Sequence, residues 1–177
     1  MTLSTPRPTT WTVTPAAVGS AEASALLRDY HVEVSDRYYR LHQGRDSTPA
    51  EIEEGLADSP SDDLAPPTGV FLIGRHHGKA HACAGLRVLA AGTAELTRVY
   101  VRPAVRGTGG GAALLAAAEQ AARDLGAERI VLDTRLDLVE ARALYSRHGY
   151  AEIPAYNAGP YAQAWYGREL VATRGAG

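Results

Sequence analysis

The chain has 177 residues, an apolar fraction of 45%, a charged fraction of 21% and a formal net charge of −2. A chain of this size can bury a sizeable core as one domain, which we expect to span 1–177 with flexible ends at 1–9 and 171–177. The balanced charge argues against nucleic acid as a partner, and the longest apolar run, 112–118, is far below the about 20 residues that cross a bilayer. With a single cysteine, Cys83, and no secretory signal pattern, we expect a cytoplasmic protein.

The first half of the chain predicts one strand, two helices and an antiparallel meander. Period-two alternation over 10–14 predicts a short strand, and apolar residues spaced by three and four after Ser20 predict a helix that ends near Leu41. N-cap candidates before Pro49 predict a second helix to about Ala57. Turn residues then separate three predicted strands at 70–75, 80–89 and 94–101.

The second half alternates helices and strands. The expected elements are a helix at 109–125, a strand at 129–133, a helix at 138–148 and strands at 150–153 and 163–170. A strand, a helix and a buried strand in succession predict a right-handed parallel crossover within an otherwise antiparallel sheet. The fold class that follows is α+β.

A glycine-rich turn, Arg106-Gly107-Thr108-Gly109-Gly110-Gly111, joins a predicted strand to a predicted helix. Glycines let successive backbone N–H groups point at an anion, and the helix start adds partial positive charge, so the turn predicts a phosphate-binding site. A Walker P-loop is excluded because no lysine occurs between Arg102 and Arg123. Gly107, Gly109 and Ala112 fit a dinucleotide fingerprint with Asp133 as the ribose-binding acid, so an NAD(P)-binding oxidoreductase stays open as an alternative.

The same turn also fits the pattern Gln/Arg-x-x-Gly-x-Gly/Ala, at Arg106, Gly109 and Gly111. Together with Val-Tyr-Val-Arg-Pro at 99–103 and the segment Glu140-Ala-Arg-Ala-Leu-Tyr-Ser-Arg-His-Gly-Tyr150, it resembles the acetyl-CoA signature of the GNAT superfamily of N-acetyltransferases. The resemblance implies a three-layer α/β/α fold whose mixed, mainly antiparallel sheet has about seven strands and about four flanking helices. Leu138 departs from the family pattern, since many members carry an asparagine there that contacts the cofactor.

The resemblance implies acetyl-CoA as co-substrate and direct acetyl transfer to a primary amine of a small molecule or amino acid in a ternary complex. It implies that Tyr145 protonates the departing CoA sulfur and that Glu95 accepts the amine proton. The strand ends at 94–101 and 129–133 are expected to separate and admit the pantetheine arm. The residues it implies for cofactor binding are Val99, Tyr100, Val101, Arg106, Gly107, Thr108, Gly109, Gly110, Gly111 and Tyr145. A non-catalytic acyl-CoA sensor of the same fold stays open as a second alternative.

The acceptor pocket in this family is built from the first helices, the hairpin and the loop before the last strand. The resemblance therefore implies Tyr30, Arg87, Asn157 and Tyr161 as substrate-binding residues. An arginine in a tyrosine-lined cleft favours an amine that also carries a carboxylate, whereas the acidic stretch 58–63 favours a cationic amine or a peptide, and both remain open.

Three further expectations concern individual side chains. Strand alternation places Glu95 and Arg98 on opposite faces of the sheet. The six histidines lack the spacing of metal ligands, so no metal is expected, and Cys83 among small strand residues predicts a buried, inert thiol. The expected partner is a small-molecule amine, and a homodimer is left open.

Overall fold

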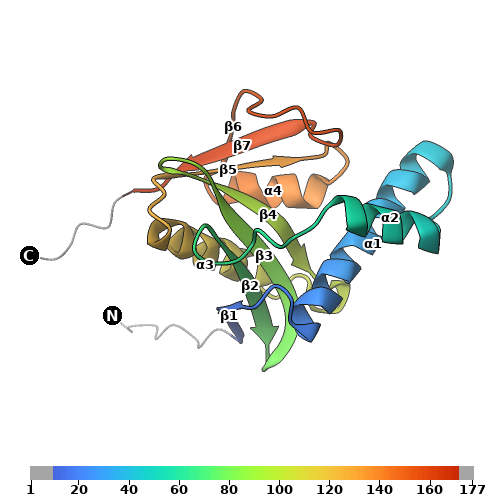
Figure 1. Ribbon diagram of the computed structural model, residues 1–177, viewed down its shortest axis with the longest axis horizontal. Helices are drawn as coiled ribbons and strands as arrows, with labels where there is room; N and C mark the ends of the chain where they lie inside the picture. The colour runs from blue at the N-terminus through green and yellow to red at the C-terminus, as the bar shows by residue number, and fades with distance from the viewer. Residues whose placement is uncertain (1–9, 172–177) are drawn as a thin grey trace, which may run out of the picture.

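The computed structural model describes residues 10–171 and shows one mixed sheet between two layers of helices (Figure 1). The expected flexible ends lie outside the described residues, apart from Val171. The elements in chain order are β1 (Trp11–Ala16), α1 (Ala21–Gln43), α2 (Pro49–Asp58), β2 (Gly69–His76), β3 (Lys79–Ala90), β4 (Thr93–Val101), the 3-10 turn η1 (Pro103–Val105), α3 (Gly110–Asp124), β5 (Arg129–Thr134), α4 (Val139–Arg147), β6 (Ala151–Glu152) and β7 (Ala164–Glu169).

The seven strands lie in the order β1-β2-β3-β4-β5-β7-β6. All neighbouring pairs are antiparallel except β4 and β5, which are parallel and are connected through α3. The predicted α+β class, the mixed sheet and the parallel crossover are thereby confirmed. None of the helices between residues 10 and 171 is long and apolar enough to cross a membrane.

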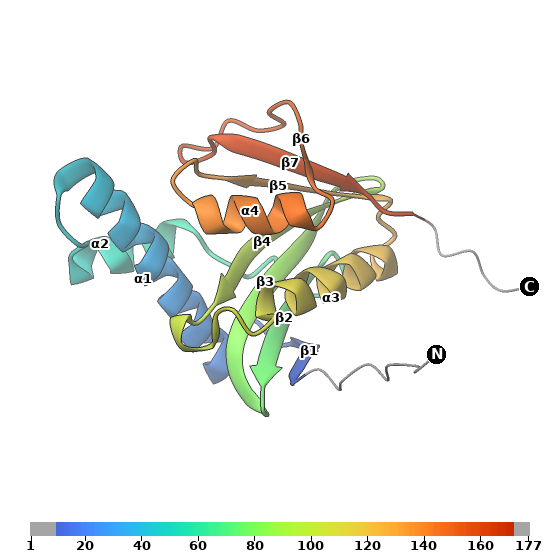
Figure 2. The same ribbon diagram turned by 180° about the vertical axis from the view of Figure 1, so that it is seen from behind.

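Helices cover both faces of the sheet (Figure 2), and an apolar cluster is buried on each face. On one face α3 contributes Leu114 and α4 contributes Tyr145 to the cluster that includes Leu132, and on the other α1 packs through Leu26 in the cluster that includes Phe71. Each fully buried side chain of this kind contributes about 1.5–3 kcal/mol to folding. The sheet that carries the site is therefore held from both sides.

Local signals set the helix ends that border the site. Ser20 caps α1 by accepting a hydrogen bond from the Ala23 amide, and α1 ends at Gly44, whose φ of +68° suits glycine. In α2 the Thr48 hydroxyl and the Glu51 side chain form a reciprocal capping box. The capping box fixes the start of α2, and the last residue of this helix, Asp58, lines the pocket described below.

A β-bulge interrupts β4 at Arg98. Cys83 pairs with Tyr100 and Gly85 with Thr97, so two residues of β4, Arg98 and Val99, stand opposite a single residue of β3. Arg98 has a φ of +57°, outside the strand region. The expectation that Glu95 and Arg98 lie on opposite faces was wrong, because the extra residue reverses the alternation and both side chains line one pocket.

The parallel strands β4 and β5 separate soon after they meet. They pair at three positions, of which Glu95 with Val131 is the last. Beyond this pair the strands diverge, as the sequence resemblance implied (Figure 1). The separation leaves an opening in the sheet whose sides are the later residues of β4 and Asp133 near the end of β5.

Candidate active site

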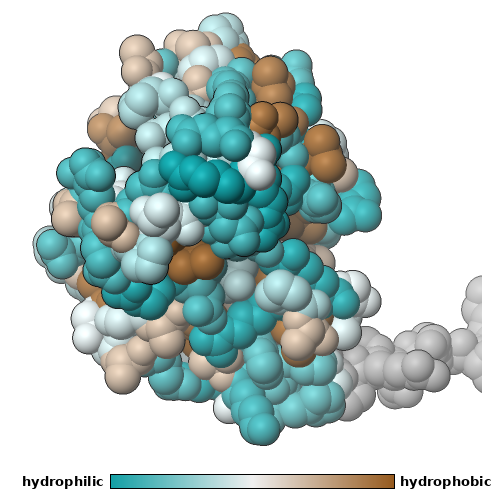
Figure 3. All heavy atoms as spheres, turned by 90° about the vertical axis from the view of Figure 1, so that its right-hand side faces the viewer, coloured by the Kyte–Doolittle hydropathy of each residue, from teal (hydrophilic) through white to brown (hydrophobic). Residues whose placement is uncertain are grey.

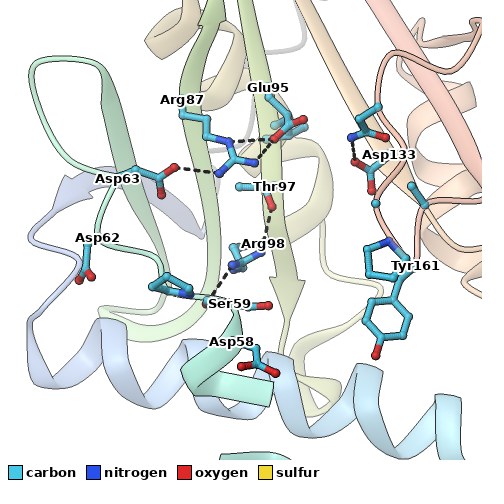
Figure 4. Close-up of a pocket in the computed structure, with 16 residues that line it drawn as sticks. Asp58, Ser59, Asp62, Asp63, Arg87, Glu95, Thr97, Arg98, Asp133 and Tyr161 are labelled. Atoms are coloured by element: carbon cyan, nitrogen blue, oxygen red, sulfur yellow. Dashed lines mark hydrogen bonds and ion pairs between the residues drawn. The ribbon is translucent and has the colours of Figure 1, made fainter. Parts of the chain in front are cut away.

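A cavity of about 660 Å³ lies where β4 and β5 separate (Figure 4). Its wall combines the end of α2 and the loop after it, residues of β3, β4 and β5, and the loop before β7. On the α1–α2 side of the molecule the surface is mainly hydrophilic (Figure 3). The lining residues are Asp58, Ser59, Pro60, Asp62, Asp63, Arg87, Glu95, Leu96, Thr97, Arg98, Asp133, Asn157, Gly159, Pro160, Tyr161 and Ala162.

Glu95 is the buried carboxylate of this cavity, with a side chain only 6% exposed. Its Oε1 accepts hydrogen bonds from Nε and Nη2 of Arg87, at 2.9 and 2.6 Å, and its Oε2 accepts one of 2.8 Å from the phenol of Tyr156. Arg87 also donates to Asp63 at 2.8 Å. A carboxylate removed from water is costly unless it is paired in this way. Glu95 is therefore held in one position at the edge of the cavity.

The same network changes the pKa of the two partners of Glu95. Burial acts to lower the pKa of Arg87, but the hydrogen bonds to Asp63 and Glu95 outweigh it and raise that pKa above its usual value. Burial, and then the bond to Glu95, raise the pKa of Tyr156. Arg87 thus lines the cavity as predicted, but two carboxylates already occupy its guanidinium.

Asn157 and Asp133 form a second polar group on the other side of the cavity. The Asn157 side-chain amide donates to Oδ2 of Asp133 at 2.7 Å and accepts from the indole nitrogen of Trp165 at 2.8 Å. Tyr161 lies below them, with an exposed ring (Figure 4). The structure therefore places predicted residues Asn157 and Tyr161 at one cavity, together with Arg87 and Glu95 on the facing side.

Tyr145 and Tyr30 approach the opening from opposite faces of the sheet, and neither lines the cavity. Tyr145 is 6% exposed and packs against Tyr150 and Tyr166, with ring centroids 5.8 and 6.1 Å away. Its phenol makes no hydrogen bond to the residues that the structure describes, whereas its backbone carbonyl accepts from the amides of His148 and Tyr150. Burial, followed by the phenols of Tyr30 and Tyr150 and the Asp133 carboxylate, raises the pKa of Tyr145. Its phenol therefore stays protonated at neutral pH and is available as a proton donor.

The glycine-rich turn lies at the other end of β4, before α3. Gly107 and Gly109 have φ values of +78° and +96°, and a Cβ at either position would meet no other atom within 4 Å. The turn is exposed and the first amides of α3 follow it, so an anionic diphosphate can approach the backbone closely. The predicted residues thus fit the diphosphate of acetyl-CoA.

Side chains around the turn fix its shape. Thr108 accepts a 3.0 Å bond from the indole of Trp11, and a Cβ on Gly110 would lie 2.7 Å from the same ring. Arg106 donates to the Val101 carbonyl at 2.9 Å and to Glu33 at 2.6 Å, and its guanidinium lies 5.9 Å from the Tyr100 ring centre. Arg106 therefore contacts two of the predicted cofactor residues from β4 and is also paired with α1.

Two other predicted cofactor residues have a mainly structural setting. Val99 packs against the α3-side cluster, and Gly111 approaches Leu144 of α4 so closely that a Cβ would lie 2.9 Å from its Cδ2.

Cys83 is fully buried, donates its S–H to the Arg98 carbonyl, and has a pKa that burial raises to about 12. A thiol with this pKa does not supply a nucleophile at neutral pH.

The sequence did not single out three residues that shape the cavity. Tyr156 and Asp63 lie in loops that the sequence places near the acceptor pocket. Only the folded chain shows that Tyr156 bonds to Glu95 and that Asp63 bonds to Arg87. Arg98 was placed on the wrong face because alternation assumes an unbroken strand.

Comparisons with known proteins find relatives in sequence and in fold. The model of the acetyltransferase (GNAT) family matches residues 27–150. An uncharacterized N-acetyltransferase of Schizosaccharomyces pombe is 32% identical over 144 residues, which cover 80% of this chain and 86% of that protein. A crystal structure described as an acyl-CoA N-acyltransferase of Klebsiella pneumoniae is 26% identical, with a TM-score of 0.68 over 93% of this chain and all of that one. A GNAT acetyltransferase of Elizabethkingia anophelis with acetyl-CoA bound has the same fold, with 15% identity and a TM-score of 0.59 over 91% of this chain and 99% of that one.

A family match over most of the chain and a curated relative above 30% identity define the class: the chain has the fold of an acyltransferase that uses acyl-CoA. The chain belongs to the GNAT family of acetyltransferases. The predicted enzyme class, an N-acetyltransferase with acetyl-CoA as co-substrate, is confirmed at this level. The oxidoreductase and the non-catalytic sensor are not favoured, and Asp133 is engaged by Asn157 at the cavity.

Proposed function

We propose that this protein transfers an acetyl group directly from acetyl-CoA to a primary amine of a small molecule or amino acid, within a ternary complex. The observation that carries the proposal is the position of Glu95, a buried and fully hydrogen-bonded carboxylate at the last residue pair before β4 and β5 separate. An amine that enters the cavity meets this carboxylate where the strands open. The cytoplasmic location and the single domain over 1–177 stay predictions.

Acetyl-CoA supplies the activated thioester, and the chain's residues provide binding and proton transfer. The backbone of β4 from Val99 to Val101 and the turn 106–111 bind its arm and diphosphate. Glu95 takes the proton that the amine loses as the C–N bond forms, directly or through Tyr156, whose phenol touches Oε2. Tyr145 gives a proton to the sulfur as the C–S bond breaks, and a raised pKa keeps its phenol protonated until that step.

Direct transfer is supported by the state of the cysteine. Cys83 is fully buried and does not line the cavity, so no thiol is positioned to carry the acetyl group between the two substrates. Proximity in a ternary complex can then supply much of the rate, because the amine and the thioester are held side by side in one site.

The test is to measure CoA release with a panel of primary amines, together with the affinity for acetyl-CoA, in variants of the two proton-transfer residues. We expect Glu95→Gln to lower kcat by about 10²–10⁴ and Tyr145→Phe to lower it to a smaller extent. Both variants should keep their affinity for acetyl-CoA, since neither side chain lies at the turn. Unchanged turnover in Glu95→Gln would remove Glu95 from its role, and loss of acetyl-CoA binding in both would indicate a damaged fold.

A further inference from the structure

Arg98 is the arginine of the cavity whose charge the protein leaves uncompensated. Among the arginines between residues 10 and 171, only Arg98, Arg123 and Arg147 have no carboxylate within 4.0 Å, and of these only Arg98 lines the cavity. Its guanidinium donates to three neutral oxygens, the carbonyl of Ser59 and the hydroxyls of Ser61 and Thr97, each at a long 3.3 Å. These bonds orient the side chain toward the end of α2 but leave its charge without a counter-ion (Figure 4).

The backbone at Arg98 is held in a conformation that disfavours a large side chain. A φ of +57° costs a non-glycine residue roughly 1–2 kcal/mol, and glycine or asparagine would adopt it more easily. Because the bulge is what turns Arg98 onto the same face as Glu95, the strained conformation delivers a guanidinium to the cavity. Strain of this kind persists where the surrounding structure maintains it, and it often accompanies function.

The remaining charges of the cavity limit what this guanidinium can bind. Asp58, Asp62, Asp63, Glu95 and Asp133 all line the cavity, whereas Arg87 already contacts two of these carboxylates. So much negative charge opposes a dianion such as a phosphate monoester and favours an ammonium group. A ligand with one carboxylate and one ammonium satisfies both Arg98 and the acidic wall.

We propose that the acceptor is an amino-acid-like zwitterion whose carboxylate pairs with Arg98 while its amino group lies toward Glu95. The inference rests on the proposed function and names its substrate class. Arg98 follows Glu95 by three positions, so along a strand their Cα atoms are at most about 10 Å apart. Two long side chains that face one cavity over this span can both reach a small molecule, and a guanidinium binds a carboxylate through two parallel hydrogen bonds.

The test compares matched acceptors with the full-length protein and acetyl-CoA. Each of the twenty common amino acids is assayed for acetylation beside its primary carboxamide and its decarboxylated amine. We expect kcat/KM for the preferred amino acid to exceed that of its two counterparts without a carboxylate by about tenfold to a hundredfold, which is the usual size of one charge-assisted pair. The difference should lie mainly in KM, because the carboxylate is remote from the bond that forms.

The variants are Arg98→Asn, Arg98→Lys and, as a matched control, Arg147→Gln. Asparagine tolerates the positive φ, so Arg98→Asn should fold with an unchanged or higher melting temperature and lose the preference for the carboxylate. Arg98→Lys should restore part of that preference, because it keeps the charge but not the two-pronged geometry. Arg147 is exposed in the last turn of α4, outside the cavity, and its substitution should leave the preference intact.

The outcomes separate this inference from the function on which it rests. Equal kcat/KM for amino acids and their counterparts without a carboxylate in the wild type would overturn the inference while leaving acetyl transfer to amines standing. A preference that survives in Arg98→Asn would likewise exclude Arg98 as its source. Transfer to no amine of either set, in a protein that binds acetyl-CoA, would overturn both.

Discussion

The phenol of Tyr156 donates a 2.8 Å hydrogen bond to Oε2 of Glu95, although the two residues are 61 positions apart in the chain. Arg87 donates to the other carboxylate oxygen, so Glu95 is hydrogen-bonded to a residue of β3 on one side and to a residue of the loop before β7 on the other. The loop that closes the acceptor side of the cavity is thereby tied to the proposed proton acceptor. Movement of this loop and the orientation of Glu95 are consequently coupled.

Removal of this bond should impair turnover without affecting acetyl-CoA. We expect Tyr156→Phe to lower kcat/KM for the amine by about tenfold, since a hydrogen bond to a charged group contributes about 1.5–3 kcal/mol. The affinity for acetyl-CoA should stay the same, because the turn 106–111 does not touch this loop. Steady-state kinetics with a titration of acetyl-CoA measure both effects. As a control, Tyr39→Phe changes a phenol on α1 that lies against Arg45, outside the cavity, and should leave the kinetics unaltered.

Arg106 and Glu33 should have opposite effects on cofactor affinity. Their side chains pair at 2.6 Å, so the carboxylate partly neutralises the guanidinium beside the proposed diphosphate site. Arg106→Gln should therefore weaken acetyl-CoA binding, whereas Glu33→Gln should strengthen it by freeing the positive charge. The changes should shrink at high salt, because both groups are partly exposed. Calorimetric titration at two salt concentrations measures them, and weaker binding in Glu33→Gln would contradict the assignment of Arg106.

Two neighbouring glycines should differ in their tolerance of a methyl group. A Cβ on Gly110 would lie 2.7 Å from the rigid indole of Trp11, whereas one on Gly111 would meet the flexible end of Leu144 at 2.9 Å. Gly110→Ala should therefore lower the melting temperature more than Gly111→Ala and should displace the turn, with weaker acetyl-CoA binding as the result. Thermal unfolding with and without acetyl-CoA gives both quantities. Equal melting temperatures for the two variants would show that the Trp11 contact does not constrain the turn.

Protonation of His31 should make the folded protein less stable at acidic pH. Burial, and then the nearby Arg98 and Arg28 guanidinium groups, lower the pKa of His31 in the folded protein. A histidine in the unfolded chain has a pKa of about 6.5, so as the pH falls below this value the unfolded state binds a proton more readily than the folded state does. The stability that neutral His31 contributes to the fold is therefore fully present above about pH 6.5 and is lost as the pH falls further. We expect a drop in melting temperature from pH 7.5 to 5.5 that His31→Gln reduces. His42→Gln, on the surface of α1, should leave this drop in place.

The fold could be predicted from the sequence because its elements carry strong local signals. The capping residues Ser20 and Thr48 mark helix starts, and the spaced apolar residues of α1 and α3 mark their buried faces. The parallel pairing of β4 and β5 followed from the helix between them. These features depend on residues close together in the chain, where periodicity and capping decide the outcome.

The acceptor side of the site could be predicted only in part. Four of the residues that the resemblance implied for the site, Glu95, Arg87, Asn157 and Tyr161, line one cavity, whereas Tyr30 packs against Tyr100 and does not line it; their roles stay predictions. The partners of Glu95 come from distant loops, so no local pattern identifies them. The bulge that reverses Arg98 depends on the register between β3 and β4, which the sequence of one strand does not specify.

Direct transfer requires that acetyl-CoA and the amine are bound in this cavity at the same time. Its most direct test is the initial velocity of CoA release, measured while the concentrations of acetyl-CoA and of the best acceptor amine are varied together. We expect intersecting double-reciprocal lines in the wild type and in Cys83→Ala, because both substrates must be bound before the acetyl group moves. Parallel lines, with an acetylated protein detected by mass spectrometry when acetyl-CoA is added alone, would contradict it.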